Sequence, residues 1–239
     1  KEFLMFDSDW KKLENLFPEL NTLPAALTQF KKHANLLKKA SSRVRTTAST
    51  DSRMLRHYAE SLEMLRYVGE IRGEHICDVG SGGGFPGIIW AIMLPKHKIH
   101  LIESNLKKAA LLEKLKEKLN LQNIKVHPKR AESLARDGLR EQCTLVGVRA
   151  VDKLVTTVEY TAPLAKLGAT IIAPKGTLVR TEITEAEKAI KLLGCEIVNV
   201  HKMRIEVSQS ISIVELKKIH PIDESFPRQP GFAKKKPIQ

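Results

Sequence analysis

The chain has 239 residues, of which 42% are apolar and 28% are charged, a balance that excludes a largely disordered protein. Its formal net charge is +13, which favours a polyanionic partner such as a nucleic acid or an anionic membrane surface. No apolar run approaches the ~20 residues that span a bilayer, and we recognise no signal peptide. We therefore expect a cytoplasmic protein without a membrane partner.

The first part of the chain has a helical pattern. Residues 8–40 carry apolar side chains at spacings of three and four, and two prolines interrupt this pattern. A second helix is predicted from about Asp51 to Tyr67, with Asp51 or Ser52 as its N-cap. We assign residues 1–70 to an N-terminal helical extension.

From Ile76 onward, short apolar runs typical of buried strands alternate with helical stretches. The helical stretches include Leu106–Leu119 and Glu182–Leu193. This alternation predicts an α/β fold over residues 71–220, with a mostly parallel sheet and helices on both faces. The expected strands are Ile76–Val79, Lys98–Ile102, Ile124–Val126, Leu145–Val148, Ala169–Ala173 and Ile211–Leu216.

A glycine-rich turn follows the first of these strands. Gly80, Gly82 and Gly84 permit positive φ angles and leave room for a ligand to approach the backbone. The next predicted strand ends in Glu103, about 20–25 residues beyond the turn, where such folds place a carboxylate on ribose hydroxyls. Turn and carboxylate together predict a cofactor that contains adenosine.

Two cofactors compete for this turn. Gly82, Gly84 and Gly87 satisfy the dinucleotide spacing G-x-G-x-x-G, which suits a nicotinamide-dependent (NAD-type) oxidoreductase. The order Asp78-Val79-Gly80-x-Gly82-x-Gly84 is instead typical of methyltransferases that bind S-adenosylmethionine. Phe85 and Pro86 also interrupt the place where a helix N-terminus would meet a pyrophosphate. We favour the methyltransferase, and the oxidoreductase and a non-catalytic RNA-binding protein with a relic loop remain alternatives.

Positive charge is concentrated in two segments. Residues 31–45 contain six basic residues and no acidic one, and residues 221–239 form a basic tail whose prolines predict an extended conformation. Aromatic residues make up only 5% of the chain, which disfavours serial base stacking and favours phosphate contacts with a folded nucleic acid. The basic residues of the first segment are Lys31, Lys32, Lys38, Lys39, Arg43 and Arg45.

Three cysteines, Cys77, Cys143 and Cys195, are widely spaced in apolar surroundings. An odd number without a Cys-x-x-Cys pair favours reduced core cysteines over disulfides or a metal site. We expect no bound metal.

The residues from Asp78 to Gly87 resemble the cofactor loop of the bacterial small-subunit (16S) ribosomal RNA guanine-N7 methyltransferases, also called the glucose-inhibited division protein B family. The Phe85-Pro86-Gly87 ending is the specific part of the match. The segment from Lys38 to Arg45 departs from the family's pattern. Further similar motifs are Arg56-His57, Glu60-Ser61, Glu103-Ser104, Arg130-Ala131-Glu132, Val148-Arg149-Ala150-Val151, Pro174-Lys175-Gly176 and Phe226-Pro227-Arg228-Gln229-Pro230-Gly231.

This resemblance implies a Rossmann-like class I methyltransferase that acts as a monomer on small-subunit ribosomal RNA or a ribosomal particle. S-adenosylmethionine would be its methyl donor. The resemblance implies cofactor binding by Asp78, Gly80, Gly82, Gly84, Phe85, Glu103, Ala131, Glu132 and Arg149.

The same resemblance makes Arg149, Lys175 and Arg130 the candidates for positioning the acceptor base. Guanine N7 has an exposed lone pair and no proton, so no general base is required. Arginine can read the guanine edge through O6. Structural alternatives are a surface ion pair between Arg130 and Glu132, a carboxylate partner for Arg149, and a loop start at Lys175.

Overall fold

The computed structural model describes residues 7–40, 44, 54–149, 151–203 and 211–239. The expected helix caps Asp51 and Ser52, and Arg43 and Arg45 of the basic segment, lie outside these residues.

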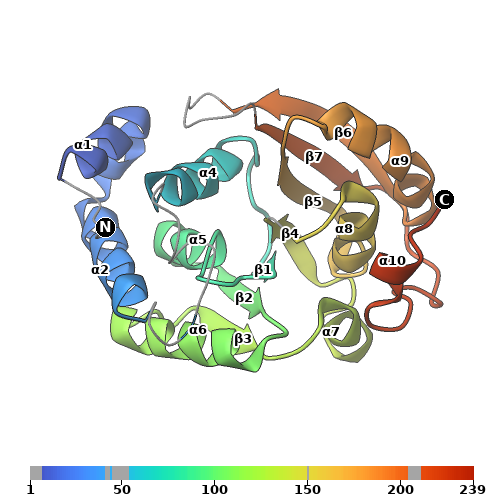
Figure 1. Ribbon diagram of the computed structural model, residues 1–239, viewed down its shortest axis with the longest axis horizontal. Helices are drawn as coiled ribbons and strands as arrows, with labels where there is room; N and C mark the ends of the chain where they lie inside the picture. Colours follow the sequence, from blue (N-terminus) through green and yellow to red (C-terminus); the bar gives the residue numbers. More distant parts are fainter. Residues whose placement is uncertain (1–6, 41–43, 45–53, 150, 204–210) are drawn as a thin grey trace.

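Seven strands form one sheet in the order β3-β2-β1-β4-β5-β7-β6 (Figure 1). Strands β1 to β5 pair in parallel, and β7 is antiparallel to both β5 and β6. The predicted α/β fold with a mostly parallel sheet is confirmed. The strands are β1 (His75–Val79), β2 (Lys98–Ile102), β3 (Ile124–His127), β4 (Cys143–Val148), β5 (Ala165–Lys175), β6 (Cys195–Lys202) and β7 (Ser212–Lys218).

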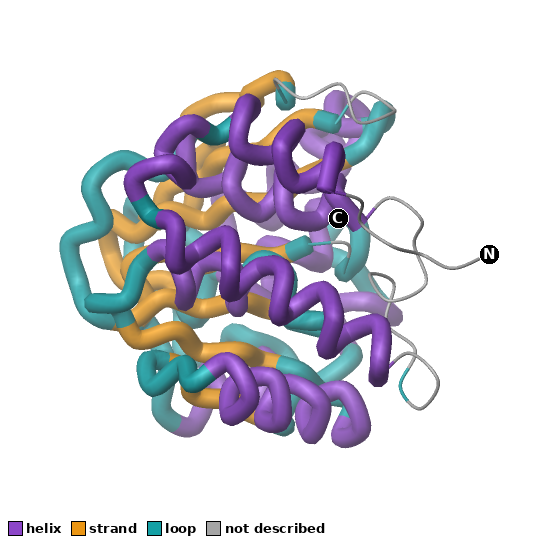
Figure 2. Tube along the Cα trace, turned by 90° about the vertical axis from the view of Figure 1, so that its left-hand side faces the viewer, coloured by secondary structure: helices purple, strands orange, loops and turns teal. Residues whose placement is uncertain are grey.

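Helices cover both faces of the sheet, and Figures 1 and 2 show them lying along the strands. One buried core joins the N-terminal helices to α5 and α6, and a second core joins the sheet to the helices that follow β3. The helices on the first face are α1 (Asp7–Leu16), η1 (Pro18–Thr22), α2 (Pro24–Ala40), α4 (Met54–Arg66), α5 (Gly87–Met93) and α6 (Leu106–Leu119). Those on the second face are α7 (Ala131–Asp137), α8 (Leu154–Thr161), α9 (Val179–Leu192) and α10 (Phe232–Lys235).

Strand alternation explains how the functional residues are presented. Successive side chains of a strand point to opposite faces. In β1, Ile76 belongs to the first core, whereas Cys77 and Val79 belong to the second. Asp78 therefore lies on the face of α5, where its carboxylate accepts a hydrogen bond from the first residue of that helix, Gly87.

The C-terminal segment is not extended as the sequence predicts. It contains α10 and folds back onto α8, where the Arg228 guanidinium forms a charge-assisted ion pair with Glu159. The Glu159 side chain is only 1% exposed. Burial of this carboxylate against one arginine fixes the tail against the sheet domain.

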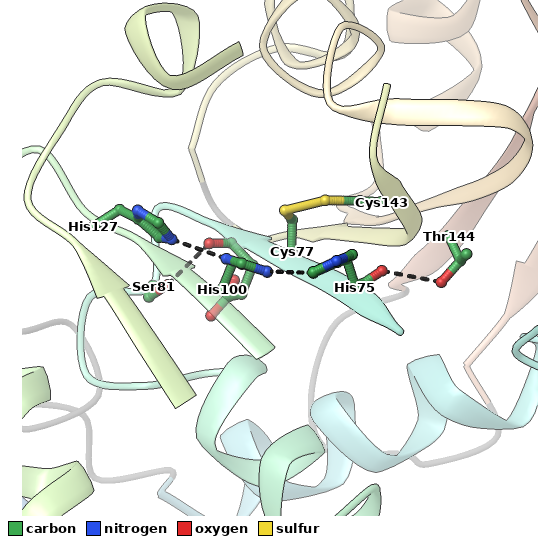
Figure 3. The surroundings of a disulfide bond; sticks show 8 residues. His75, Cys77, Ser81, His100, His127, Cys143 and Thr144 are labelled. Atoms are coloured by element: carbon green, nitrogen blue, oxygen red, sulfur yellow. Dashed lines mark hydrogen bonds between the residues drawn. A yellow bond between two sulfur atoms is a disulfide. The ribbon is translucent and has the colours of Figure 1, made fainter. Parts of the chain in front are cut away.

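The prediction of three reduced cysteines is wrong for one pair. Cys77 of β1 and Cys143 of β4 are joined by a disulfide, and their Cα atoms lie 6.2 Å apart (Figure 3). The two residues are 66 positions apart in sequence, so only the pairing of β1 with β4 brings them together. Cys195 is free and buried, as expected.

Candidate active site

The glycine turn after β1 is held against β2. The amides of Gly80 and Ser81 both donate to the carbonyl oxygen of Ile102, at 2.8 and 3.2 Å. Gly80, Gly82 and Gly84 all have positive φ angles. A Cβ atom on Gly84 would collide with Ile88, whereas a Cβ on Gly82 would meet nothing closer than 3.7 Å. The turn is therefore packed on its inner side and open at Gly82.

Asp78 lies beneath this turn and is fully buried. Its Oδ2 accepts a hydrogen bond of 2.9 Å from the amide of Gly87. Its Oδ1 has no hydrogen-bond partner among the described residues. Burial raises the pKa of the Asp78 carboxyl to about 7. The site thus contains a buried acceptor atom that a ligand with N–H or O–H groups can satisfy.

Glu103 follows β2 and links the turn to α6. Its Oε2 accepts from the amide of Gly82 at 3.0 Å, and its Oε1 accepts from the amide of Asn105 at 2.8 Å. Asn105 in turn caps α6 by accepting from the amide of Lys108. The carboxylate predicted to bind ribose hydroxyls is therefore oriented by backbone amides at the rim of the turn.

Arg149 follows β4 and lies next to the turn, because Val148 pairs with Val79 in the parallel register. Its Nη1 donates to Glu60 Oε2 at 2.7 Å and contacts His57 Nδ1 at 2.6 Å. Both partners belong to α4. The arginine is thus the partner of a buried carboxylate, as the structural alternative proposed, and it also lies beside the cofactor turn.

Phe85 is enclosed by side chains from the N-terminal helices. The rings of His33, His57 and Tyr58 lie 5.0, 5.5 and 5.0 Å from its ring, centroid to centroid. The Arg149 guanidinium carbon lies 5.3 Å from the same centroid, within the range of a cation–π interaction. Phe85 thereby joins Arg149 to α2 and α4.

Sequence reasoning missed the role of His33. Its Nε2 lies 3.0 Å from the carbonyl oxygen of Gly83, and its Nδ1 lies 2.9 Å from the hydroxyl of Tyr58. Burial lowers the pKa of His33 to about 4, so the ring is neutral at pH 7. His57 and Glu60 belong to family-like motifs of α4 and could be found from the sequence. His33 lies in the basic segment 31–45 and belongs to no such motif.

Two predicted cofactor residues lie at the start of α7. Ala131 and Glu132 are both buried there, and Arg130 is exposed directly before them. The Glu132 Oε1 accepts a hydrogen bond of 2.8 Å from the amide of Gly231. In the described part of the chain no ion pair joins Arg130 to Glu132, so that structural alternative finds no support.

Lys175 lies at the end of β5, one strand beyond Arg149. Its Nζ donates to the carbonyl oxygen of Asp152 at 2.6 Å and pairs with Glu182 at 3.0 Å. Burial lowers the pKa of Lys175, an effect that the hydrogen bond to Glu182 opposes. The structure thus brings Asp78, the glycine turn, Glu103 and Arg149 together, and it holds Lys175 by separate partners.

Comparison with known proteins identifies the family. The model of the family described as rRNA small subunit methyltransferase G (GidB) matches residues 26–211. The chain belongs to this family.

Two relatives are both named ribosomal RNA small subunit methyltransferase G. The protein of Roseiflexus castenholzii is 36% identical, covering 89% of this chain and 92% of its own length. That of a Geobacillus species is 34% identical, covering 90% and 92%. The solved structure of M. jannaschii TYW2 in complex with AdoMet shares the fold, with a TM-score of 0.53, 18% identity and coverage of 68% of this chain and 76% of its own.

These comparisons confirm the predicted Rossmann-like class I methyltransferase that uses S-adenosylmethionine, and they overturn the oxidoreductase alternative. The site fits this donor. Its open turn at Gly82, its unsatisfied Asp78 oxygen and its oriented Glu103 carboxylate suit a ligand with an ammonium group and ribose hydroxyls.

Within the described ranges, no helix combines the length and the apolar character that a bilayer-spanning helix needs. No group of three or more His, Cys, Asp or Glu side chains in those ranges is arranged to hold a metal ion.

Proposed function

We propose that this chain transfers the methyl group of S-adenosylmethionine to N7 of a guanine in small-subunit (16S) ribosomal RNA. One observation supports the site: the glycine turn, Glu103 and Arg149 converge at the carboxyl ends of β1, β2 and β4. Open α/β sheets bind their ligands at this edge.

The cofactor is held by residues that the structure already orients. S-adenosylmethionine supplies, when bound, a methyl group on a positively charged sulfur. Asp78 Oδ1 accepts a hydrogen bond from the ligand, and Glu103 accepts from ribose hydroxyls while two amides fix its orientation. Gly80, Gly82 and Gly84 let the backbone approach the ligand. Ala131 and Glu132 border the adenine.

Catalysis by this chain consists of positioning. Guanine N7 attacks with its own lone pair, so the protein needs only to align the reactants and exclude water. Holding the reacting atoms about 3 Å apart in the right orientation lowers the activation barrier by several kcal/mol. Arg149 donates to guanine O6 or a flanking phosphate, and its contacts with Glu60 and Phe85 fix its direction. Exposed Arg130 contacts the RNA around the acceptor base, whereas buried Lys175 acts through its partners Asp152 and Glu182.

We propose that the protein acts in the cytoplasm, as a monomer, on small-subunit RNA or a ribosomal particle. We also propose the division into a helical extension at 1–70, a methyltransferase domain at 71–220 and a basic tail at 221–239.

The direct test measures transfer of a labelled methyl group from S-adenosylmethionine to purified small-subunit RNA and to small subunits. Digestion should release the label as 7-methylguanosine. Arg149→Lys keeps the charge but loses the planar, paired N–H donors of the guanidinium. The rate of methyl transfer by this variant should therefore fall at least tenfold. Calorimetric binding of the cofactor without transfer to either substrate would support the relic alternative instead.

A further inference from the structure

A groove runs between α2 and α6, outside the cofactor site. Its volume is about 580 Å³. Apolar side chains, including Leu36 of α2 and Leu111 and Leu115 of α6, form its floor. Its walls carry four lysines, Lys39 from α2 and Lys107, Lys114 and Lys118 from α6.

Charge is distributed unevenly over the helices. Helix α2 has four lysines and no acidic residue, and α6 has five lysines and two glutamates. These two helices therefore carry seven of the thirteen net positive charges. Helix α9 is electrically balanced, with three basic and three acidic residues. The excess charge is thus concentrated around this groove.

The groove lysines are available to a partner. Lys39, Lys107, Lys114 and Lys118 are all exposed, and none forms an ion pair within the described ranges. In contrast, Lys116 on the same helix pairs with Glu113.

One end of the groove lies at the functional edge of the sheet, and the groove extends from there along α6. Helix α6 begins directly after Glu103 and its cap Asn105, so Lys107 stands close in sequence to the cofactor carboxylate. Helices α2 and α6 are in contact, and residues of both line the groove. A strand of RNA that reaches the cofactor turn can therefore continue into the groove.

We propose that this groove binds the sugar–phosphate backbone of the ribosomal RNA substrate, at a distance from the methylated base. This inference rests on the proposed function and adds its docking surface. The four lysines contact phosphates, which fixes the register of the RNA without reading its sequence. The leucine floor covers apolar faces of ribose and base.

The test replaces Lys39, Lys114 and Lys118 with glutamine in one variant and measures its affinity for small-subunit RNA by fluorescence anisotropy over a series of salt concentrations. Loss of three phosphate contacts should reduce the slope of log K against log salt by about 2 to 3. The dissociation constant at low salt should rise at least tenfold. Affinity for S-adenosylmethionine should stay unchanged.

A matched control removes the same charge outside the groove, before β2 and on α9. Lys96, Lys188 and Lys191 are exposed there and form no ion pair in the described residues. Their triple glutamine variant should bind RNA within about twofold of the unaltered protein, with an unchanged salt slope. Equal losses in both variants would mean that net charge alone acts and would overturn the proposal.

Two further results would count against RNA binding in the groove. An unchanged RNA affinity in the groove variant would overturn the proposal, and a defect confined to assembled small subunits would assign the groove to a ribosomal protein instead. Because binding is measured without methyl transfer, failure of the groove is distinguishable from failure of the proposed function. The latter would appear as absence of 7-methylguanosine with the unaltered protein.

Discussion

Glu60 determines where Arg149 lies. Its side chain is 5% exposed, and it accepts from both Arg149 and Arg56. A buried carboxylate between two guanidinium groups offsets their desolvation, and removing it leaves positive charge without compensation. The residue acts on the site through Arg149 and is a positioning residue.

Glu60→Gln should therefore lower both turnover and stability. The amide keeps the shape but loses the charge, so Arg149 is released from its orientation. We expect kcat to fall at least tenfold at saturating substrates and the free energy of unfolding to fall by about 3 kcal/mol in urea titrations. Glu60→Asp should restore part of the activity. An unaltered kcat in a destabilised Glu60→Gln protein would reduce Glu60 to a structural role.

Asp78 should couple cofactor affinity to pH. Its pKa of about 7 means that half of the carboxyl groups are protonated near neutrality in the unliganded protein. A positively charged group at Oδ1 favours the ionised form, so binding must release this proton. Calorimetry should show affinity for S-adenosylmethionine about tenfold weaker at pH 6 than at pH 8. Asp78→Asn should abolish the dependence, and a flat profile in the unaltered protein would contradict this role.

Three histidines form a row across β1, β2 and β3 (Figure 3). Nitrogen atoms of His75 and His100, and of His100 and His127, lie 2.9 Å apart. Burial, with neighbouring histidines and lysines, lowers the pKa of His100 to about 3, and burial lowers that of His127 to about 4. The folded protein therefore resists protonation that the unfolded chain accepts near pH 6.5.

Stability from this row should be lost on acidification. As pH falls below 6.5 the unfolded chain binds protons that folded His100 does not, so the free energy of unfolding falls. We expect His100 to lower the free energy of unfolding by up to about 2 kcal/mol as the pH falls from 6.5 to 5. Asp78 contributes with the opposite sign there, because its folded pKa is raised. Urea titrations of His100→Gln should show a flatter dependence on pH, and an unchanged slope would contradict the assignment.

At the scale of elements, local patterns located most of the sheet. Helix α6 and strand β2 have the predicted bounds, because their apolar residues mark them in the sequence. Strand β6 was not predicted. It is an edge strand in which exposed Glu196, Asn199 and Lys202 interrupt the apolar residues, so its pattern is less regular than that of the predicted strands.

The residues of the site also fall into those that the sequence predicts and those that it does not. The turn and Glu103 could be predicted, since their spacing along one βαβ unit is local. The contacts of His33 with Gly83 and of Glu60 with Arg149 join residues 50 and 89 positions apart. No periodicity encodes such a pairing. The family-like motifs marked α4 without saying what it touches.

The C-terminal element gives a stability prediction. Arg228 is the charged partner of buried Glu159, so Arg228→Ala should lower the free energy of unfolding by about 3 kcal/mol, as measured by urea denaturation. Lys235→Ala is the control, because Lys235 is exposed and forms no ion pair in the described residues. Equal stability of the two variants would show that the tail does not fasten the domain.

At the scale of the whole molecule, the N-terminal helices belong to the site as well as to the fold. Helix α2 supplies His33 and α4 supplies Glu60, and both approach the cofactor turn. The same helix α2 borders the lysine groove. Cofactor and acceptor base are thereby assigned to the carboxyl edge of the sheet, and the RNA backbone to a groove that begins there and extends along α6.

Mapping 7-methylguanosine in small-subunit RNA tests this account most directly. RNA from cells that lack the protein should lose one 7-methylguanosine, which the unaltered gene should restore and Arg149→Lys should not. Complete modification without the protein, or full restoration by Arg149→Lys, would contradict the account.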